Sequence, residues 1–338
     1  MSRPLPLPGS DARLEVSYAP AHTLQAQLDD PRTLAVFGFG DDAPASDDPR
    51  WLRVPLRPLQ DQAVVEVWRA AGPVSHGRDG DVAWASDGRL LFGAMEVPEP
   101  EGDDIRAAAH HAYARMCGFI AGSQATHLLR VWNYMDAITL GEGDDERYRR
   151  FCVGRVEGLG QFEAGRLPAA TAIGRCDGRR VLQVYWLAAT GPGTPLENPR
   201  QVSAYRYPRQ YGPQPPSFAR AMLPPTGSDM PLLLSGTAAI VGHASQHAGS
   251  VRAQVDETMA NIGVLIGSAR RIRPSLPAAP DAATPLKVYV RHPEHAAEVA
   301  AALEANLGRQ VPRLLLHAQV CRRELLVEID GVHGVPVV

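Results

Sequence analysis

The sequence predicts an α+β fold in which helices pack on one face of mixed sheets. The clearest sign is the order of periodic segments in residues 232–331, which alternate as strand, helix, strand, helix, strand and strand. Within this stretch, residues 251–266 carry apolar side chains at spacings of three and four, as in an amphipathic helix packed on a sheet. The 338 residues are enough for two sizeable lobes or for one fused core.

The first hundred residues read as strands separated by loops. Short apolar runs at residues 33–39, 62–68 and 90–95 alternate with Asp, Pro and Gly, the residues that form turns. Residues 38–40 (Gly-Phe-Gly) match part of a dinucleotide-binding loop, but a third glycine and a following helix are missing. A tight turn is therefore the favoured interpretation of these glycines.

A helix is predicted over residues 105–121. Asp103 and Asp104 offer N-caps at its start, and Gly122 follows its last residue. A strand over residues 126–134 comes next and leads into an arginine-rich segment.

This segment, residues 141–155, contains candidate ligands for a carboxylate. A guanidinium binds a carboxylate bidentately and a tyrosine hydroxyl adds a hydrogen bond, which points to Arg155 and Tyr148. Among the arginines, Arg155 is the better candidate for a carboxylate ligand, because it follows a glycine and stands at the start of a less charged stretch of sequence. The other arginines are more simply explained as a solvated helix face paired with nearby acids: Arg147, Arg149 and Arg150, with Glu142, Asp144 and Asp145.

Two further strands, over residues 168–174 and 181–190, are predicted to pair around a turn at Asp177-Gly178. The chain then becomes rich in proline, with nine prolines between Pro192 and Pro225. These prolines predict a long but stiffened loop.

Long loops in compact proteins often form sites, and this one carries several tyrosines and arginines. Arg209 and Tyr211 are its first-ranked candidates for substrate binding, with Tyr205 beside them. The loop aromatics can equally be packing anchors, and the sequence leaves both interpretations open.

Residues 232–241 form a predicted buried strand, and the following helix, capped by Ser245 or Ser250, runs to about residue 266. His243 and His247 near its start have no third ligand at a recognisable spacing, so capping or hydrogen bonding is favoured over a metal site. HExxH, GxSxG and Walker motifs are absent from the sequence.

A Pro/Ala linker, a strand over residues 286–291 and a helix over residues 293–307 lead to the final segment. There we predict a hairpin over residues 312–331 that turns at Arg322-Arg323. This register pairs Leu316 with Ile329 and His317 with Glu328.

Alternation along the predicted hairpin places Cys321 and Glu328 on one face, about 13 Å apart at roughly 3.3 Å per residue. The opposite face is wholly apolar. Glu328 is then either an exposed strand residue or an acid whose pKa is raised by burial, and its position alone does not decide between the two.

Composition excludes several classes of protein. A net charge of -3 gives no broad attraction to nucleic acid or to an anionic membrane. The first eleven residues lack the apolar run of a signal peptide, and no stretch of about 20 apolar residues could span a bilayer, so we expect a cytoplasmic protein. The four cysteines form no CxxC pair, which favours free thiols over a zinc ribbon or disulfides.

The last hundred residues resemble the RidA (YjgF) family. The likeness lies in the strand at Gly236, the helix with Gln254 and Asn261, residues 286–292 (LKVYVRH), and the pair Pro312-Arg313 before Glu328. RidA proteins are trimers with sites between neighbouring subunits, and an arginine matched here by Arg313 binds the substrate carboxylate.

Most of the chain resembles the chorismatases, in which RidA-like units are fused in one polypeptide. The matching segments are RVWNYMDAI, GDDERYRRFCVGR, PAATAIG, YPRQYGPQPPSFARA, SGTAAIVGHASQHAG and CRRELLVEIDG. The resemblance implies a degenerate RidA-like lobe at residues 1–145 and a catalytic one at residues 146–338. It also implies cleavage of chorismate to release pyruvate, with no metal or organic cofactor.

In this resemblance Glu328 matches the catalytic acid, which protonates the enolpyruvyl methylene carbon before the C4 hydroxyl displaces pyruvate. Cys321 and Gly236 match the subgroup that forms 3-hydroxybenzoate, where Cys321 shapes the product instead of attacking the substrate. The likeness extends to a bifunctional branch of pigment biosynthesis that also forms 4-hydroxybenzoate. The two carboxylates of chorismate require cationic or hydrogen-bonding anchors, for which we choose Arg155, Arg209 and Tyr211.

Two alternatives remain open at this stage. One is a RidA-type imine hydrolase in which Arg313 binds the carboxylate and Glu328 positions water. The other is a metabolite-binding protein without catalysis. Fusion of the units in one chain makes a monomer the expected state, with a trimer as the alternative.

Overall fold

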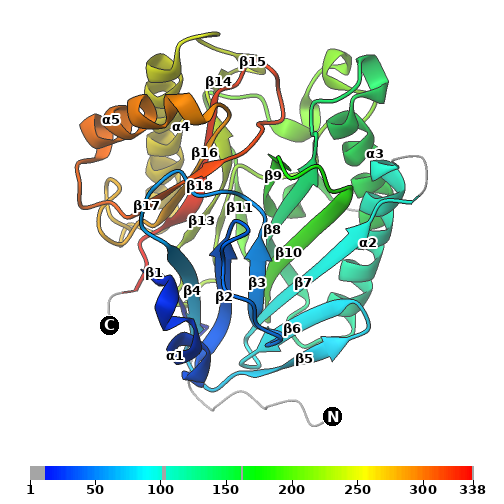
Figure 1. Cartoon of the computed structure of the whole chain (residues 1–338), viewed down its shortest axis with the longest axis vertical. Coiled ribbons are helices and arrows are strands. Elements are labelled where there is room, and N and C mark those ends of the chain that lie inside the picture. The colour runs from blue at the N-terminus through cyan, green and yellow to red at the C-terminus, as the bar shows by residue number, and fades with distance from the viewer. Residues whose placement is uncertain (1–11, 101–103, 161–162, 337–338) are drawn as a thin grey trace.

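The structure, a computed structural model, describes residues 12–100, 104–160 and 163–336. Its strands form three main sheets with helices on their outer faces (Figure 1). The predicted α+β class is therefore confirmed. The predicted N-cap Asp103 and the N-terminal eleven residues lie outside the described residues.

The first sheet is the smallest and has four strands, with one short helix, α1 (Leu24–Asp29), beside it. Its strand order is β1 (Leu14–Pro20), β4 (Val64–Ala70), β2 (Thr33–Phe39) and β3 (Trp51–Val54). Strands β2 and β3 are parallel, and the other pairs are antiparallel.

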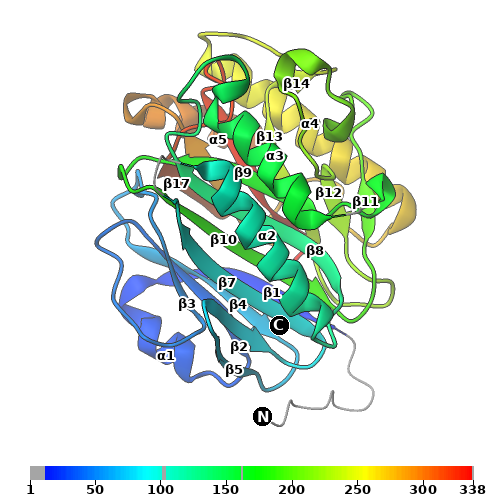
Figure 2. The ribbon, with the colours of Figure 1, turned by 90° about the vertical axis from the view of Figure 1, so that its right-hand side faces the viewer.

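The second sheet has six strands, covered by helices α2 (Ile105–Ala121) and α3 (Arg147–Leu159), which cross its outer face in Figure 2. Its strand order is β5 (Ser75–Asp79), β6 (Val82–Ser86), β7 (Leu90–Pro98), β10 (Val181–Ala189), β8 (His127–Asp136) and β9 (Ala169–Arg175).

The third sheet also has six strands and is covered by α4 (Val251–Ile272) and α5 (Ala296–Leu307). A two-stranded ribbon, β14 (Ile240–Val241) with β15 (Ala244–Ser245), extends beyond it. The order of the six strands is β11 (Thr194–Leu196), β12 (Ala221–Leu223), β13 (Leu232–Ala238), β18 (Val327–His333), β16 (Leu286–Val290) and β17 (Arg313–His317).

The second and third sheets have the same topology. In each, the first three strands in sequence are followed by the sixth, fourth and fifth, and the fourth and fifth strands are parallel. The four strands of the first sheet, β1, β4, β2 and β3, correspond to the third, sixth, fourth and fifth strands of the larger sheets. The chain therefore contains a truncated first unit (residues 14–70), a second unit (75–189) and a third unit (194–333).

One hydrophobic core lies between the three sheets, and others lie under the helices. The central core takes residues from all three units, including Phe37, Trp132 and Tyr289. Separate cores fill the spaces between each sheet and its own helices. Because the units share their innermost core, they fold around one another and place the interfaces between units at the rims of the sheets.

Local predictions from the sequence agree well with these elements. Helix α2 has the predicted limits, and Asp104 caps it by accepting hydrogen bonds from the backbone of Arg106 and Ala107. Helix α4 is longer than predicted: it continues through Gly267 to Ile272, because Leu265, Ile266 and Ala269 extend its apolar face.

Two predicted strand pairings are wrong. Strands β9 and β10 do not pair; β8 lies between them. The predicted hairpin over residues 312–331 is also absent, because β17 pairs in parallel with β16, which itself pairs with β18. Glu328 therefore lies opposite Ala238 and Tyr289 instead of His317, and the distance of about 13 Å derived from the hairpin has no basis.

The division of the chain at residue 145 stays a prediction, and the second sheet contains strands from both sides of it. Over the described ranges, each helix is too short or too polar to cross a lipid bilayer.

Candidate active site

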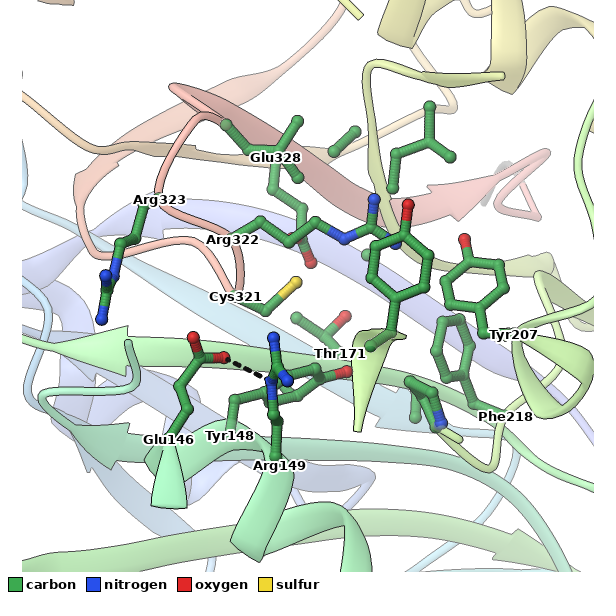
Figure 3. Close-up of a pocket in the computed structure, with 18 of the residues that line it drawn as sticks. Glu146, Tyr148, Arg149, Thr171, Tyr207, Phe218, Cys321, Arg322, Arg323 and Glu328 are labelled. Carbon is green, nitrogen blue, oxygen red and sulfur yellow. Dashed lines mark ion pairs between the residues drawn. The ribbon is translucent and has the colours of Figure 1, made fainter. Parts of the chain in front are cut away.

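A cavity of about 360 Å³ opens between the second and third units (Figure 3). One wall comes from α3 and β9, the opposite wall from β13 and β18, and the proline-rich loop after β11 covers one side. The lining includes Tyr148, Arg155, Thr171, Tyr207, Tyr211, Phe218, Arg220, Gly236, Cys321, Arg322 and Glu328.

Glu328 is the buried carboxylic acid among the residues that line this cavity. Alternation in β18 points Val327 and Ile329 toward the helices and turns Glu328 the other way, where its residue is 5% exposed. Burial, together with the charge of Asp330, raises the pKa of Glu328 to about 8. The side chain is therefore largely protonated at neutral pH, as a proton donor must be.

Gly236 makes room for this acid. It lies on β13, the strand next to β18, and a Cβ there would overlap with Glu328 Oε1. The same Cβ would lie 3.3 Å from Thr171 Oγ1, so Glu328 and Thr171 approach one another across the glycine. An alanine at this position would displace the carboxyl group.

Cys321 faces the same space from the loop between β17 and β18 (Figure 3). Arg291, at the end of β16, fixes this loop by donating to the carbonyl oxygens of Val320 (2.6 Å) and Arg322 (2.7 Å), the residues on either side of the cysteine. Burial and the nearby Glu328 raise the pKa of the Cys321 thiol well above its usual range. A thiol in this state is a poor nucleophile, so its contribution is steric and polar.

Arg155 is a buried cation with two unsatisfied nitrogen atoms among the described residues. Its residue is 2% exposed on α3, and its Nε and Nη2 atoms have no hydrogen bond to any residue that the structure describes. Its guanidinium packs over the Tyr113 ring, 5.1 Å from the ring centre. Gly154 allows this burial, because a Cβ there would overlap with the backbone of Arg106 on α2. An unpaired buried guanidinium is costly in free energy unless an anion binds it.

Arg220 is the second buried guanidinium of the cavity. Its Nη2 donates to Tyr207 Oη (2.6 Å) and to the Val202 carbonyl (3.1 Å), while its Nε has no partner among the described residues. It lies near enough to Glu328 to oppose the rise of that acid's pKa. Arg155 and Arg220 together give the cavity two places where a carboxylate can bind.

Aromatic rings and a third guanidinium form the side under the loop. Arg322 lies over Tyr211, 4.1 Å from the ring centre, and over Tyr207 at 5.2 Å. Tyr211 Oη is 3.1 Å from His243 Nδ1. These contacts hold the proline-rich loop against the third unit and enclose the cavity.

The structure brings together most, but not all, of the residues singled out in the sequence. Six of the nine line the cavity: Glu328, Cys321, Arg155, Tyr148, Tyr211 and Gly236. Three do not. Arg209 is exposed and pairs with Asp144, Tyr205 packs beside Arg206, and Arg313 donates to the Gly308 carbonyl (2.8 Å).

The other predicted contacts differ in detail. Arg147, Arg149 and Arg150 do pair with acids, but the partners are Glu99, Glu146 and Asp104, and Arg147 is buried instead of solvated. His243 and His247 bond Tyr211 and Glu257, respectively. In the described part of the chain, no three His, Cys, Asp or Glu side chains are grouped as metal ligands.

Sequence reasoning missed Arg220, Tyr207, Thr171 and Arg322. Arg220 and Tyr207 lie in the proline-rich segment, for which the sequence leaves a site and packing anchors equally open, and nothing in their spacing ranks them above Arg209. Thr171 stands in an apolar strand, and its polar side chain among alanines was the one available signal.

The raised pKa of Glu328 makes the stability of the protein depend on pH. The pKa of Glu328 is about 8 in the folded protein and about 4.3 in an unfolded chain. The unfolding free energy that the neutral carboxyl contributes is therefore present at low pH and is lost as the pH rises toward 8. Glu328→Gln cannot ionise. Between pH 6 and pH 9 the wild type is expected to lose about 3 kcal/mol more unfolding free energy than the variant. Denaturant titrations at both pH values measure this, and equal losses would contradict the burial of an acid.

The chemistry available in this cavity is proton donation to a small organic anion. A largely neutral carboxylic acid faces two buried guanidinium groups across an enclosed space with aromatic walls. A dianion with an unsaturated, acid-labile bond would meet the guanidiniums with its carboxylates and the acid with its reactive carbon.

Comparisons with known proteins agree on one family. Residues 66–188 match the family model described as chorismatase FkbO/Hyg5-like, N-terminal. A chorismatase of Streptomyces rapamycinicus is 38% identical over 281 residues, 81% of this chain and 83% of that protein. A 3-hydroxybenzoate synthase of Streptomyces hygroscopicus is 34% identical over 79% of this chain and 80% of that protein. A crystal structure of a chorismatase superimposes with a TM-score of 0.85 at 32% identity, covering 96% of this chain and 99% of that one.

Proposed function

This chain belongs to the chorismatase family, and from that premise we propose that it cleaves chorismate to 3-hydroxybenzoate and pyruvate, with Glu328 as the acid. The observation that carries the proposal is the buried Glu328 carboxyl in a cavity with two buried guanidinium groups, Arg155 and Arg220. A related protein named 3-hydroxybenzoate synthase supports the choice of aromatic product.

The substrate is a dianion with a ring carboxylate and an enolpyruvyl carboxylate. We assign these two groups to Arg155 on α3, in the second unit, and Arg220 at the end of the proline-rich loop, in the third unit. Tyr211 and Tyr148 supply hydroxyl groups at the cavity wall. Arg220 thus takes the role that the sequence suggested for Arg209, whose guanidinium pairs with Asp144 outside the cavity.

The first step of the proposed reaction is a proton transfer. Glu328 gives its proton to the methylene carbon of the enol ether, and the resulting oxocarbenium weakens the bond between C3 and the ether oxygen. As that bond breaks, pyruvate leaves with the bonding electrons. The oxygen of the C4 hydroxyl attacks C3 and loses its proton to the Glu328 carboxylate, which regenerates the acid.

Opening of the C4–O bond and loss of one ring hydrogen to the C3 oxygen then give the aromatic product. The atoms of chorismate equal those of 3-hydroxybenzoate and pyruvate together, so no water is incorporated. Turnover in ¹⁸O-labelled water is expected to yield 3-hydroxybenzoate without the label. A labelled C3 hydroxyl would show that solvent, not the C4 hydroxyl, attacks the ring.

Cys321 is proposed to direct the intermediate toward 3-hydroxybenzoate. Its thiol faces the same space as Glu328 and, with its raised pKa, acts by shape and weak hydrogen bonding. Cys321→Ala is expected to retain chorismate consumption within about tenfold but to lower the fraction of 3-hydroxybenzoate. Chromatography of the products measures this fraction, and an unchanged profile would remove the role.

A second aromatic product is compatible with the same acid. When the C4 oxygen stays on C4 and that carbon loses its hydrogen, 4-hydroxybenzoate and pyruvate form with the same atom balance. We propose this as the minor route, consistent with a role in pigment biosynthesis, and the same chromatography detects it.

The two alternatives from the sequence receive less support. An imine hydrolase of the RidA type would use Arg313, which donates to the Gly308 carbonyl and does not line the cavity. A cavity that only binds metabolites would not need an acid with its pKa raised to about 8. Because one chain supplies both walls of the cavity, we propose a monomer, which light scattering tests.

A further inference from the structure

A chain of four buried charged side chains passes from the first unit to the cavity. Glu66, on β4 of the first unit, pairs with Lys287 Nζ at 2.9 Å. Lys287 Nζ lies 3.9 Å from Asp330 Oδ1, and Asp330 Oδ2 lies 3.1 Å from Arg130 Nη2. Lys287 and Asp330 belong to the third unit and Arg130 to the second, so all three units contribute to a chain of zero net charge.

Asp330 is the most heavily hydrogen-bonded acid of this series. Its Oδ2 accepts hydrogen bonds from Arg130 Nη2, Trp132 Nε1 (3.0 Å), Thr171 Oγ1 (2.6 Å) and Tyr289 Oη (3.1 Å). The residue is fully buried. Its Oδ2 is therefore the meeting point of four donors beside two cations, whereas its Oδ1 has no hydrogen-bond partner among the described residues.

This series of charged side chains extends to Glu328. Asp330 and Glu328 are two residues apart on β18 and therefore project to the same face of the sheet. Thr171 connects them: its hydroxyl donates to Asp330, accepts from Arg130 (2.6 Å) and lines the cavity beside Glu328. Its single proton is already given to Asp330, so Thr171 can only accept from Glu328.

We propose that Asp330 is a positioning residue of the reaction, whose carboxylate, paired with Arg130 and Lys287, keeps Glu328 protonated between turnovers. The inference rests on the proposed function only for the role of Glu328 as the acid. A second fixed negative charge on the same buried face disfavours ionisation of the first carboxyl, because two like charges close together cannot both be stable.

Other charges around Glu328 act in the opposite direction. Arg130 on β8, Arg220 after the loop and Arg291 at the end of β16 favour its ionised form. Cys321 and Tyr148, which also face it, are neutral because burial raises the pKa of each well above neutrality. Burial, the largest cause, and the charge of Asp330 together outweigh the three guanidiniums.

Glu66 gives the truncated first unit a part in the site. Burial alone would discharge Lys287, but Glu66 and Asp330 raise its pKa and keep it cationic. Without the charge of Glu66, Asp330 still pairs with Lys287, and the three remaining side chains carry one net positive charge, which favours ionisation of Glu328. Glutamine at position 66 keeps an oxygen for the Trp68 Nε1 donor, so this substitution changes charge with little change of shape.

The test is the titration of the Glu328 carboxyl in the full-length free enzyme, followed by ¹³C NMR of glutamate-labelled protein. The signal is assigned by its absence in Glu328→Gln. We expect a midpoint near 8 in the wild type, a midpoint lower by about one pH unit or more in Asp330→Asn, and a smaller decrease in Glu66→Gln. Glu15→Gln is the matched control, because Glu15 belongs to the same first unit but pairs with Arg13 and Arg32. Its midpoint should equal that of the wild type.

An unchanged midpoint in folded Asp330→Asn overturns the proposal. If that variant does not fold, an unchanged midpoint in Glu66→Gln overturns it instead. The alkaline limb of kcat/KM for chorismate should move with the midpoint in each variant. A midpoint that moves while the pH profile stays fixed would contradict Glu328 as the acid and leave the role of Asp330 intact, so the two failures are distinguishable.

Discussion

Replacing Glu328 with glutamine is expected to lower kcat for chorismate by about a thousandfold, within the range of roughly 10²–10⁴ for loss of a general acid. The amide keeps the shape of the side chain in its space beside Gly236 but cannot give a proton to the methylene carbon. KM should change little, because the carboxylates bind elsewhere. Pyruvate release, followed in a coupled assay, measures the effect.

Glu324→Gln is the control for this prediction. Glu324 lines the same cavity four residues earlier, but its carboxylate accepts a hydrogen bond from Ser245 (2.7 Å). This variant should retain activity within about threefold. Wild-type turnover in Glu328→Gln, or an equal loss in both variants, would show that Glu328 is not the acid.

Replacing Arg155 with methionine is expected to reduce kcat/KM by about a hundredfold or more, since a buried charge-assisted carboxylate contact is lost. The same variant should be more thermally stable without ligand. Arg155 is buried with two unpaired nitrogen atoms, and methionine removes that cost while filling similar volume. A gain in stability together with a loss of affinity is characteristic of a residue kept for binding.

Arg209→Met is the matched control for the Arg155 variant. It removes an arginine that the sequence suggested as a carboxylate anchor but that the structure places outside the cavity, in an exposed pair with Asp144. Both kcat/KM and thermal stability should stay close to the wild type. If Arg209→Met loses activity and Arg155→Met does not, the assignment of the anchors is reversed.

The features that the sequence predicted well depend on residues that lie close together in the sequence. Alternation in residues 327–330 separates Val327 and Ile329 from Glu328 and Asp330 whatever strands lie beside them, so the acid could be placed on one face. Helix α2 could be located because its cap and its closing glycine are adjacent to its ends in sequence.

What it could not predict depends on contacts between distant segments. Residues 314–316 of β17 are three leucines buried on both faces of the sheet, and such an apolar run fits several neighbouring strands equally well. The lack of a partner for Arg155 and the junction of Arg130 with Asp330, 200 residues apart in sequence, follow from tertiary packing alone. Arg209 and Arg220 lie in the same proline-rich segment, but Arg220 is buried and Arg209 is exposed.

The arrangement of three related units explains why the site lies where it does. The second and third units expose β9 and β13 to one another, and the Ala170 amide donates to Ser235 Oγ (3.0 Å) across that boundary. The cavity opens beside this contact. Residues on both sides must therefore be fixed relative to each other, which one continuous chain with a shared core provides.

Quantifying the products of chorismate turnover tests the central claim most directly. Purified protein is incubated with chorismate in the presence of a chelator, and pyruvate and 3-hydroxybenzoate are measured by chromatography. The mechanism predicts one pyruvate for each chorismate consumed, with 3-hydroxybenzoate as the main aromatic product and none from Glu328→Gln. Chorismate that is bound but released unchanged, with no pyruvate, would contradict it.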